Sequence, residues 1–525
     1  MLKLLRSIIK PFLHSHLSRF KNALQHPESA QTQVLEKIVA AFAQTQYGRS
    51  LNIRATDDYQ NFAAKTPLVT YDDLSEWLTR QRQSEKNILV AEPVRFYEKT
   101  SGSAAAAKLI PYTQSLKNSF NRMFFIWLAD LLDNLPGLQC GKTFISISPA
   151  FQQNESTEQD KRVGLADDAE YLNRCAQALL KPFLVLPPAI KRLQEPMNFK
   201  HALALTLLAE ARLEIISIWN PSFFEIILDY LESNTERLTH DLRRGAVTLE
   251  GVEFTLKPAS DARLALLKKT PILWDEIWRE VKLISCWTSA QAKPASLRLA
   301  AKFPDAFMQG KGLLATEAPM TLPLIEAHGF APLLTEVFFE FLDERNQIKR
   351  LHELEIGSEY AIILTQQGGL YRYLIGDRVR VTGIYQATPC LEFVGRTAEV
   401  CDLVGEKLNA QFVGECFARL STRSDFQILM PVMNPSPHYL LVVDKLTTNA
   451  TVLQTELDTS LQEAFHYRQA RMLGQLGGVQ VLEAPRARDI YFTYYLGKGQ
   501  KFGDIKPRHL ISDLNDATKL RLSFK

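Results

Sequence analysis

The sequence EIISIWNPSFFEIILDYLESNTERL, residues 214–238, joins a short β-rich run to a longer helical stretch. Apolar residues recur at intervals of three and four in the second part, from Phe223 onward. Similar β-rich runs are KTFISISP (142–149), KLISCWTS (282–289), TEVFFEFLD (335–343) and EYAIILTQ (359–366). Because helical stretches separate these runs, the pattern predicts an α/β fold with a largely buried sheet.

The segments on either side of this α/β centre have different patterns. Residues 1 to 90 predict mostly helix, and Leu370–Val404 predicts a small β-rich module of short strands around turns. Later, FQILMPVMN (426–434), HYLLVVDKL (438–446), GGVQVLEAP (477–485) and DIYFTYYLGKG (489–499) predict strands, and residues 451–471 predict a helix. We therefore expect an N-terminal domain of residues 1–396 and a small α+β C-terminal domain of residues 397–525, joined by a hinge near Gly395-Arg396.

Composition limits the possible partners. The 525 residues are 46% hydrophobic and 23% charged, which is typical of a soluble globular protein. Because 61 basic and 58 acidic residues nearly cancel, no charge excess favours nucleic acid as a partner. The six cysteines form no C-x-x-C pair, so we expect free thiols in a reducing cytoplasm. The basic segment 1–20 has only short apolar runs, so we expect no membrane span. We expect a helix packed on the body, and the alternative is loose contact with a membrane surface.

One stretch suits the phosphates of a nucleotide. In EKTSGSAAAAKLIPYTQSL (98–116), Ser101, Gly102 and Ser103 offer hydroxyls and backbone N–H donors, and Lys108 adds a positive charge. The alternative is a helix that begins at Ser103, although Pro111 would interrupt it and LIPY (109–112) is strand-like.

A second stretch, GLLATEAPMTLPL (312–324), suits a metal–phosphate group. Thr316 offers a hydroxyl to a phosphate oxygen, and Glu317 offers a carboxylate to Mg²⁺. The alternative is an ordinary exposed loop glutamate.

Two further stretches could take part in a site, one by binding a ribose and the other by supplying a mobile lysine. In LYRYLIGDRVRVTG (370–383), Gly376-Asp377 predicts a turn whose carboxylate either accepts both ribose hydroxyls or bonds its own backbone. Arg396, at the end of EFVGR, would contact the same sugar. LGKGQKFGDIKPRHL (496–510) predicts a flexible basic loop, either a solvated turn or the carrier of a lysine that stabilises negative charge in an active site.

In this order, the stretches resemble the acyl-adenylate-forming superfamily. In detail they are similar to a bacterial-like member of the auxin-responsive acyl-acid amido synthetase family. The resemblance runs from about residue 35 to the end of the chain, and its motifs are specific as an ordered set. It is carried by TQYGRSLNI, TPLVTYDDLSEWL, YEKTSGS with KLIPYT, QGKGLLATE, VFFEF, LYRYLIGDRVRVTG, FVGR and VGEKLNAQFV.

The resemblance implies a ligase with a large multi-sheet N-terminal adenylation domain and a small mobile C-terminal domain. A carboxylic acid would attack the α-phosphate of ATP with Mg²⁺, giving an acyl-adenylate and pyrophosphate. An amine, usually an amino acid in the family, would then displace AMP to form an amide. The resemblance implies that Ser101, Gly102 and Ser103 bind the β- and γ-phosphates, that Thr316 binds the α-phosphate and that Glu317 binds Mg²⁺. It also implies that Asp377 binds the ribose with Arg396 beside it, and that Lys506 stabilises charge during adenylation.

The sequence departs from the family pattern at two places. Ala104–Ala107 replaces residues that usually include another hydroxyl and often a glycine, and Leu313 stands where plant members carry an aromatic residue. Two alternatives stay open. A thioester-forming enzyme that uses coenzyme A or a carrier would share the adenylation step, and the alanine run favours a degenerate member that binds ligand without turnover. The segments SISPAF (146–151) and WTSAQAK (287–293) are predicted to line the acyl pocket, which leaves the acid and the amine unidentified.

Overall fold

A layer of helices begins the chain. The computed structural model describes residues 2–524 except 84–85, 100–107, 140, 146–180, 186–187, 290–291, 328, 397–399, 405, 407, 422–423, 447–448, 473–474, 501 and 503–504. The first helices are α1 (Leu2–Gln25), α2 (Pro27–Phe42), α3 (Gln46–Ser50), α4 (Tyr59–Lys65) and α5 (Ser75–Arg82), which confirms the helical prediction for this segment.

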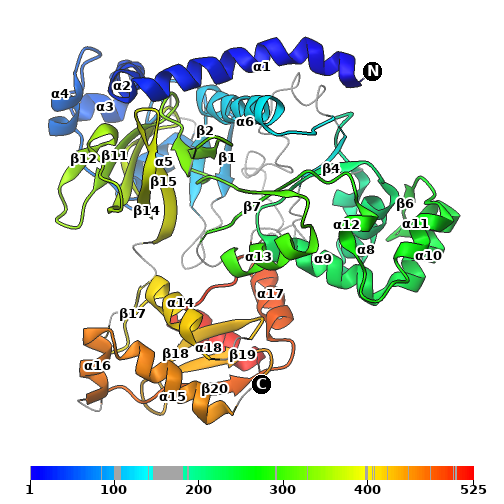
Figure 1. Cartoon of the computed structure of the whole chain (residues 1–525). Coiled ribbons are helices and arrows are strands. Elements are labelled where there is room, and N and C mark those ends of the chain that lie inside the picture. The colour runs from blue at the N-terminus through cyan, green and yellow to red at the C-terminus, as the bar shows by residue number, and fades with distance from the viewer. Residues whose placement is uncertain are drawn as a thin grey trace.

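Helix α1 lies along α6 (Gln114–Asn134) at one side of the molecule (Figure 1). The rings of Phe12 and Phe125 are 5.4 Å apart, and Lys10 Nζ lies 2.9 Å from Asp133 Oδ1. Leu13, Leu17 and other apolar residues of α1 are buried, so this helix packs on the body as expected. None of the helices that the structure describes is long and apolar enough to cross a membrane.

Among the residues that the structure describes, four parallel strands form the sheet of the α/β region. They are β3 (Lys142–Ile145), β4 (Leu213–Ser217), β7 (Leu283–Cys286) and β8 (Phe307–Gly310), in that order across the sheet. The elements around them are η3 (Pro188–Arg192), α8 (Pro196–Ala209), α9 (Pro221–Ser233), α10 (Thr235–Arg244), β5 (Ala246–Leu249), β6 (Val252–Thr255), α11 (Asp261–Leu266), α12 (Trp274–Ile277) and α13 (Lys293–Lys302). Every residue of β4 is buried, as expected for a parallel strand covered on both faces. The stretch 214–238 is therefore a strand followed by helix, although Asn234 divides that helix into α9 and α10.

A separate seven-stranded antiparallel sheet has the order β12-β11-β13-β14-β15-β10-β9. Its elements are β9 (Thr321–Pro323), β10 (Phe330–Pro332), β11 (Phe338–Leu342), β12 (Ile348–Arg350), η5 (Leu351–Glu353), β13 (Glu359–Gln366), β14 (Leu370–Tyr385) and β15 (Thr388–Arg396). The prediction of a small module of short strands over residues 370–404 is wrong, because β14 is one sixteen-residue strand inside this sheet. Strand β14 is paired with β13 on one side and with β15 on the other. Shifts in the register of both pairs accommodate turn-forming residues such as Gly376 within the strand.

The C-terminal region is an α+β unit with a three-stranded sheet, β18-β19-β20. Its elements are β16 (Val400–Cys401), β17 (Leu408–Asn409), α14 (Ala410–Arg419), β18 (Gln427–Val432), β19 (His438–Val443), α15 (Ala450–Leu461), α16 (Phe465–Met472), β20 (Gln480–Glu483), α17 (Ala487–Gly497) and α18 (Leu514–Ser523). The strands predicted over 426–434, 438–446 and 477–485 are confirmed, whereas the single helix predicted over 451–471 is two helices.

The strand predicted over residues 489–499 is wrong, because these residues belong mostly to helix α17. Tyr491 and Tyr495 are four residues apart, both are buried, and their rings lie 4.7 Å apart. Such spacing places both rings on one helix face, so burial against the core outweighs the strand preference of aromatic residues.

In this structure the C-terminal unit packs against α8 and α9 of the body, and Figure 1 shows α17 close to α13 and α9. Asn220 Nδ2 donates a 2.7 Å hydrogen bond to the carbonyl of Ile505, and the rings of Phe223 and Phe502 are 5.6 Å apart. Arg488 also lies 3.1 Å from Asp229 on α9. These contacts bring the segment that contains Lys506 to the edge of the parallel sheet.

Candidate active site at the carboxyl ends of the parallel strands

Chemically distinctive side chains follow three neighbouring strands of the parallel sheet. Trp219 follows β4, Trp287 follows β7, and Lys311 follows β8. The rings of the two tryptophans are 5.7 Å apart, and the backbone N–H of Trp287 donates to the carbonyl of Trp219 at 2.9 Å. In open α/β sheets, ligands bind beside the carboxyl ends of the strands, so this edge is the candidate active site.

Thr316 and Glu317 form the tip of a tight turn on the segment that leaves β8. A bridge pairs Leu314 with Pro319, and Gly312 packs so closely that an added Cβ would lie 2.3 Å from the carbonyl oxygen of Thr321. Glu317 is only 8% exposed, which contradicts the alternative of an ordinary exposed loop glutamate.

This turn is held by hydrogen bonds from two separate parts of the body. The Tyr112 hydroxyl donates to the carbonyl of Thr316 at 2.7 Å, and Gln366 Nε2 donates to the carbonyl of Glu317 at 3.0 Å. Tyr112 belongs to the hairpin that carries the predicted phosphate loop, and Gln366 ends β13. The backbone of the Thr-Glu pair is therefore fixed before any ligand binds.

The predicted phosphate loop connects two paired strands. These are β1 (Phe96–Lys99) and β2 (Leu109–Tyr112), with Lys99 opposite Leu109. The strand predicted over residues 109–112 is confirmed. Ser101, Gly102, Ser103 and Ala104–Ala107 lie outside the described residues. Lys108, at the end of the loop, places Nζ 3.5 Å from the Tyr373 hydroxyl and 5.6 Å from the centre of the Tyr71 ring.

Asp377 lies inside strand β14, so the predicted turn at Gly376-Asp377 is wrong. The positive φ of Gly376, +85°, and the register shift opposite Ala361 and Ile363 show an irregular strand at this place. Asp377 is 3% exposed, and its Cα partner on β15 is Arg396, whose side chain lies outside the described part of the chain.

Lys506 reaches the edge of the parallel sheet from the C-terminal unit. Its Nζ lies 3.6 Å from the centre of the Trp287 ring, a cation–π contact, and its carbonyl accepts a 2.8 Å hydrogen bond from the Tyr491 hydroxyl. Another lysine of the same glycine-rich stretch is already engaged, since Lys498 Nζ lies 2.6 Å from Asp516 Oδ1. Of the two lysines of this stretch that the structure describes, Lys506 is the one whose ammonium group lies against Trp287, at the end of β7.

The residues that the motif analysis missed are Lys311 and the indoles of Trp127 and Trp219. Lys311 is inside the quoted QGKGLLATE stretch, and Trp219 comes two residues after the end of β4. Their positions just after parallel strands could have identified both as candidate site residues. Trp287 belongs to the segment predicted to line the acyl pocket, whereas SISPAF lies outside the described residues.

Burial raises the pKa of Cys286, at the end of β7, to about 12, so this thiol is a poor nucleophile.

The carboxylate of Glu317 fits the predicted Mg²⁺. Within the described residues, no group of three His, Cys, Asp or Glu side chains is arranged to hold a metal ion. Mg²⁺ is commonly held by one or two carboxylates together with substrate phosphates, so a single glutamate is chemically suited to be its protein ligand.

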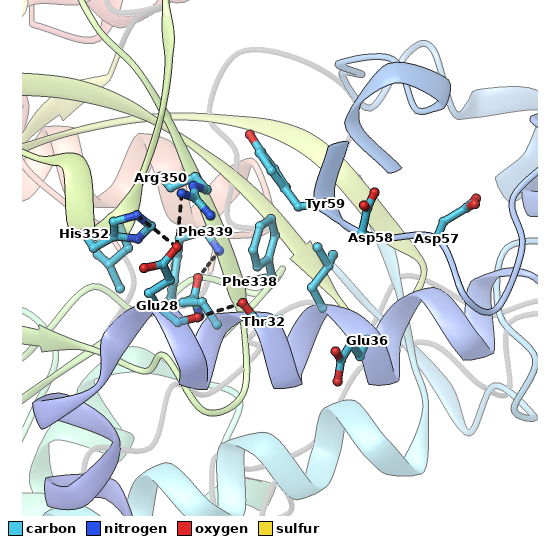
Figure 2. A pocket seen from close by; sticks show the side chains of 13 residues that line it. Glu28, Thr32, Glu36, Asp57, Asp58, Tyr59, Phe338, Phe339, Arg350 and His352 are labelled. Atoms are coloured by element: carbon cyan, nitrogen blue, oxygen red, sulfur yellow. Dashed lines mark hydrogen bonds and ion pairs between the residues drawn. The ribbon is translucent and has the colours of Figure 1, made fainter. Parts of the chain in front are cut away.

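A cavity of about 70 Å³ lies elsewhere, between α2, α4 and strands β11 and β12 (Figure 2). Its lining includes Glu28, Tyr59, Phe338 and Arg350, and Arg350 Nη2 lies 3.2 Å from Glu28 Oε1. None of the predicted site residues that the structure describes lines it, so this cavity is separate from the candidate active site.

Comparisons with known proteins identify the family of the chain. The family model described as the GH3 family N-terminal domain matches residues 16–306, and that of the GH3 family central domain matches residues 330–396. The chain is 24% identical over 431 residues to the indole-3-acetic acid-amido synthetase GH3.15 of Arabidopsis thaliana, covering 74% of this chain and 71% of the relative.

Two solved structures share the fold. A GH3.15 acyl acid amido synthetase in complex with 2,4-DB superimposes with a TM-score of 0.85 at 20% identity, covering 97% of this chain and 96% of the other. A 2-hydroxyisobutyryl-CoA ligase in the postadenylation state gives a TM-score of 0.53 at 13% identity, covering 97% and 92%. The predicted fold class, a multi-sheet α/β body with a smaller C-terminal domain, is thereby confirmed.

Proposed function

Because the chain belongs to the GH3 family, we propose that it is a ligase that activates a carboxylic acid with ATP and transfers the acyl group to an amine, most simply an amino acid. Two observations support this proposal: Tyr112 and Gln366 hold the Thr316-Glu317 turn, and Lys506 lies against Trp287 at the end of β7. Acyl activation needs a phosphate site, a metal ligand and a cation that stabilises developing negative charge, and these residues supply them.

In the proposed first step, an oxygen of the substrate carboxylate attacks the α-phosphorus of ATP and the bond to the pyrophosphate oxygen breaks. Thr316 binds the α-phosphate, and Lys506 stabilises the added charge as pyrophosphate leaves. Glu317 would hold Mg²⁺, which when bound would neutralise charge on the phosphates. Ser101, Gly102, Ser103 and Lys108 bind the β- and γ-phosphates, and Asp377 with Arg396 binds the ribose.

In the proposed second step, the amine nitrogen attacks the acyl carbon, AMP leaves with the electron pair of the acyl–oxygen bond, and the surplus proton passes to water. We propose that residues 397–525 act as a domain that turns about a hinge at Gly395-Arg396 between the steps. Such a rotation would exchange the C-terminal groups that face the bound adenylate. A cytoplasmic location fits the ATP supply that the reaction needs.

The decisive experiment is acid-dependent exchange of pyrophosphate into ATP. The purified chain receives ATP, Mg²⁺, labelled pyrophosphate and a panel of aromatic and aliphatic carboxylic acids, and exchange above the acid-free rate is expected for at least one acid. Folded protein that gives no exchange with the whole panel would contradict the proposal.

The acceptor is tested separately, with the acid that exchanges best. One reaction contains a mixture of amino acids and another contains coenzyme A, and products are identified by mass spectrometry. We expect an amide in the first reaction. A thioester alone in the second would assign the chain to thioester formation, and ATP binding without AMP release in either would show a binding protein without turnover.

A further inference from the structure

Asn220 lies between strand β4 and helix α9 and uses both ends of its side-chain amide. Its Oδ1 accepts a 3.0 Å hydrogen bond from the backbone N–H of Ser222, so Asn220 is the N-terminal cap of α9. Its Nδ2 donates a 2.7 Å hydrogen bond to the carbonyl of Ile505, in the C-terminal unit. Only 3% of Asn220 is exposed, so both hydrogen bonds are shielded from water. The cap therefore orients the amide, and its donor end binds the C-terminal unit.

The carbonyl that Asn220 binds directly precedes Lys506. The carbonyl of Lys506 itself accepts a 2.8 Å hydrogen bond from the hydroxyl of Tyr491, which belongs to α17 of the C-terminal unit. Two successive peptide carbonyls are therefore fixed, one by the body and the other by the C-terminal unit. With its backbone held on both sides, Lys506 places Nζ 3.6 Å from the centre of the Trp287 ring.

A rotation of the C-terminal unit would affect these two hydrogen bonds differently. The segment that follows Lys506 is attached to the sheet of that unit, because the backbone N–H of Leu429 on β18 donates to the carbonyl of His509 at 2.8 Å. The hydrogen bond from Tyr491 therefore joins two parts of the same unit and persists when the unit turns. The hydrogen bond from Asn220 crosses from the body to the unit, so it must break.

Two neighbouring contacts between α9 and the C-terminal unit are less specific. The rings of Phe223 and Phe502 meet edge to face with their centres 5.6 Å apart. Arg488 pairs with Asp229 at 3.1 Å, but the side chain of Asp229 is 59% exposed, and such an ion pair contributes little to stability. The buried hydrogen bond from Asn220 is the contact of the three that depends most on direction, and it is adjacent to Lys506 in the chain.

We propose that Asn220 positions Lys506 for acyl activation and releases it when the C-terminal unit turns. This inference rests on the proposed adenylation, in which Lys506 stabilises negative charge. Asn220 acts through the backbone of Ile505 and is a positioning residue. A lysine side chain has many rotamers, so fixing its backbone restricts the positions that its ammonium group can occupy. Without the Asn220 donor, the buried carbonyl of Ile505 loses its partner, and the arrangement that presents Lys506 becomes less populated.

The test separates the two ends of the Asn220 amide. Asn220→Asp and Asn220→Ser both keep an oxygen that can cap α9, and both lack the Nδ2 donor. The control is Asn449→Ser, which makes the same change at the exposed cap of α15, where Asn449 Oδ1 accepts a 2.8 Å hydrogen bond from the N–H of Thr451.

Each protein is assayed in four ways. Pyrophosphate exchange at varied ATP concentration, with the acid that exchanges best, measures the first step. Single-turnover reaction of preformed acyl-adenylate with amine measures the second step. Deuterium uptake over residues 496–511 follows the segment around Lys506 without any need for activity, and the melting temperature reports folding.

We expect both Asn220 variants to lower the maximal exchange rate by about fivefold or more, while the KM for ATP and the rate of the second step stay within about twofold. Deuterium uptake over residues 496–511 should rise, because the segment loses its contact with the body. The melting temperature should stay close to that of the natural chain, because the cap of α9 is kept. Asn220→Ser keeps the test valid even if the new carboxylate of Asn220→Asp impairs folding. Asn449→Ser should change neither the rates nor the uptake.

An unchanged exchange rate in the folded Asn220 variants, equal losses in the two steps, or unchanged deuterium uptake would each overturn the assignment of Asn220. If the natural chain exchanges pyrophosphate with no acid, the proposed reaction fails. Deuterium uptake then decides by itself whether Asn220 fixes the segment around Lys506.

Discussion

Asp377 and Arg396 are directly opposite each other across the antiparallel strands β14 and β15. The two residues proposed to bind the ribose, taken from two separate motifs of the sequence, are therefore backbone neighbours in one cross-strand pair. Arg396 is also the last residue of β15 and the last residue that the GH3 central-domain model matches. The proposed sugar site and the proposed hinge thus share one strand end.

Replacing Asp377 by alanine should raise the KM for ATP. A carboxylate that accepts both ribose hydroxyls contributes about 1.5–3 kcal/mol, so we expect an increase of roughly 10- to 100-fold. Pyrophosphate exchange at varied ATP concentration measures it. Asp377→Asn is the matched control, because it keeps the size and one acceptor oxygen and should lose less. An unchanged KM for ATP in both variants would remove Asp377 from the ribose site.

Replacing Lys506 by alanine should slow adenylation more than amide formation. Loss of a group that stabilises transition-state charge typically costs about 10²- to 10³-fold in rate. Exchange measures the first step, and single-turnover reaction of preformed acyl-adenylate with amine measures the second. Lys519→Ala, on the exposed face of α18, is the control and should leave both steps unchanged. Equal losses in both steps would contradict the role given to Lys506.

Replacing Arg372 by methionine should strongly destabilise the body. Its guanidinium makes two 2.9 Å hydrogen bonds to Glu340, and the two side chains are 6% and 0% exposed. The Tyr59 hydroxyl donates to the same carboxylate at 3.0 Å. Removing one partner leaves a buried uncompensated charge, for which we expect a loss of about 3–5 kcal/mol in the free energy of unfolding.

Urea unfolding followed by circular dichroism measures this loss. The matched control is Arg243→Met, which breaks the Arg243–Asp261 pair, whose side chains are 56% and 89% exposed. We expect a change of less than about 1 kcal/mol there. If both variants lose the same amount, the buried pair has no special role in stability.

Stability should fall in mild acid because of His509. Desolvation lowers the pKa of His509 from 6.5 to about 4, and its ring packs beside Gly414 and Phe417 of α14. Between these two values the unfolded chain binds a proton that the folded chain does not, so the free energy of unfolding decreases as the pH falls from 6.5 toward 4. Unfolding measured at several pH values should show a shallower slope for His509→Gln. His26→Gln, at an exposed position, should keep the natural slope.

Much of the local structure could be read from the sequence. Continuous apolar runs identify β4 and β7, because strands covered on both faces need no polar side. The incorrect predictions have one cause: contacts with distant parts of the chain override the local preference of the residues. Residues 489–499 have strand-forming aromatic residues, yet they form α17 because Tyr491 and Tyr495 are buried together on one helix face. Gly376 and Asp377 are residue types that favour turns, yet they lie within β14 because β13 and β15 pair with it on both sides.

The sequence by itself determined which groups are present and in what order: the Thr-Glu pair, the Gly-Asp pair and a late lysine among glycines identify the family. Only the tertiary structure decided which of them meet. Lys506 lies 3.6 Å from the Trp287 ring because the C-terminal unit packs on α9, and Asn220 becomes a candidate positioning residue because its amide binds the carbonyl of Ile505, 285 positions along the chain. Periodicity and turn chemistry are local properties, whereas contacts between distant segments depend on how buried faces pack.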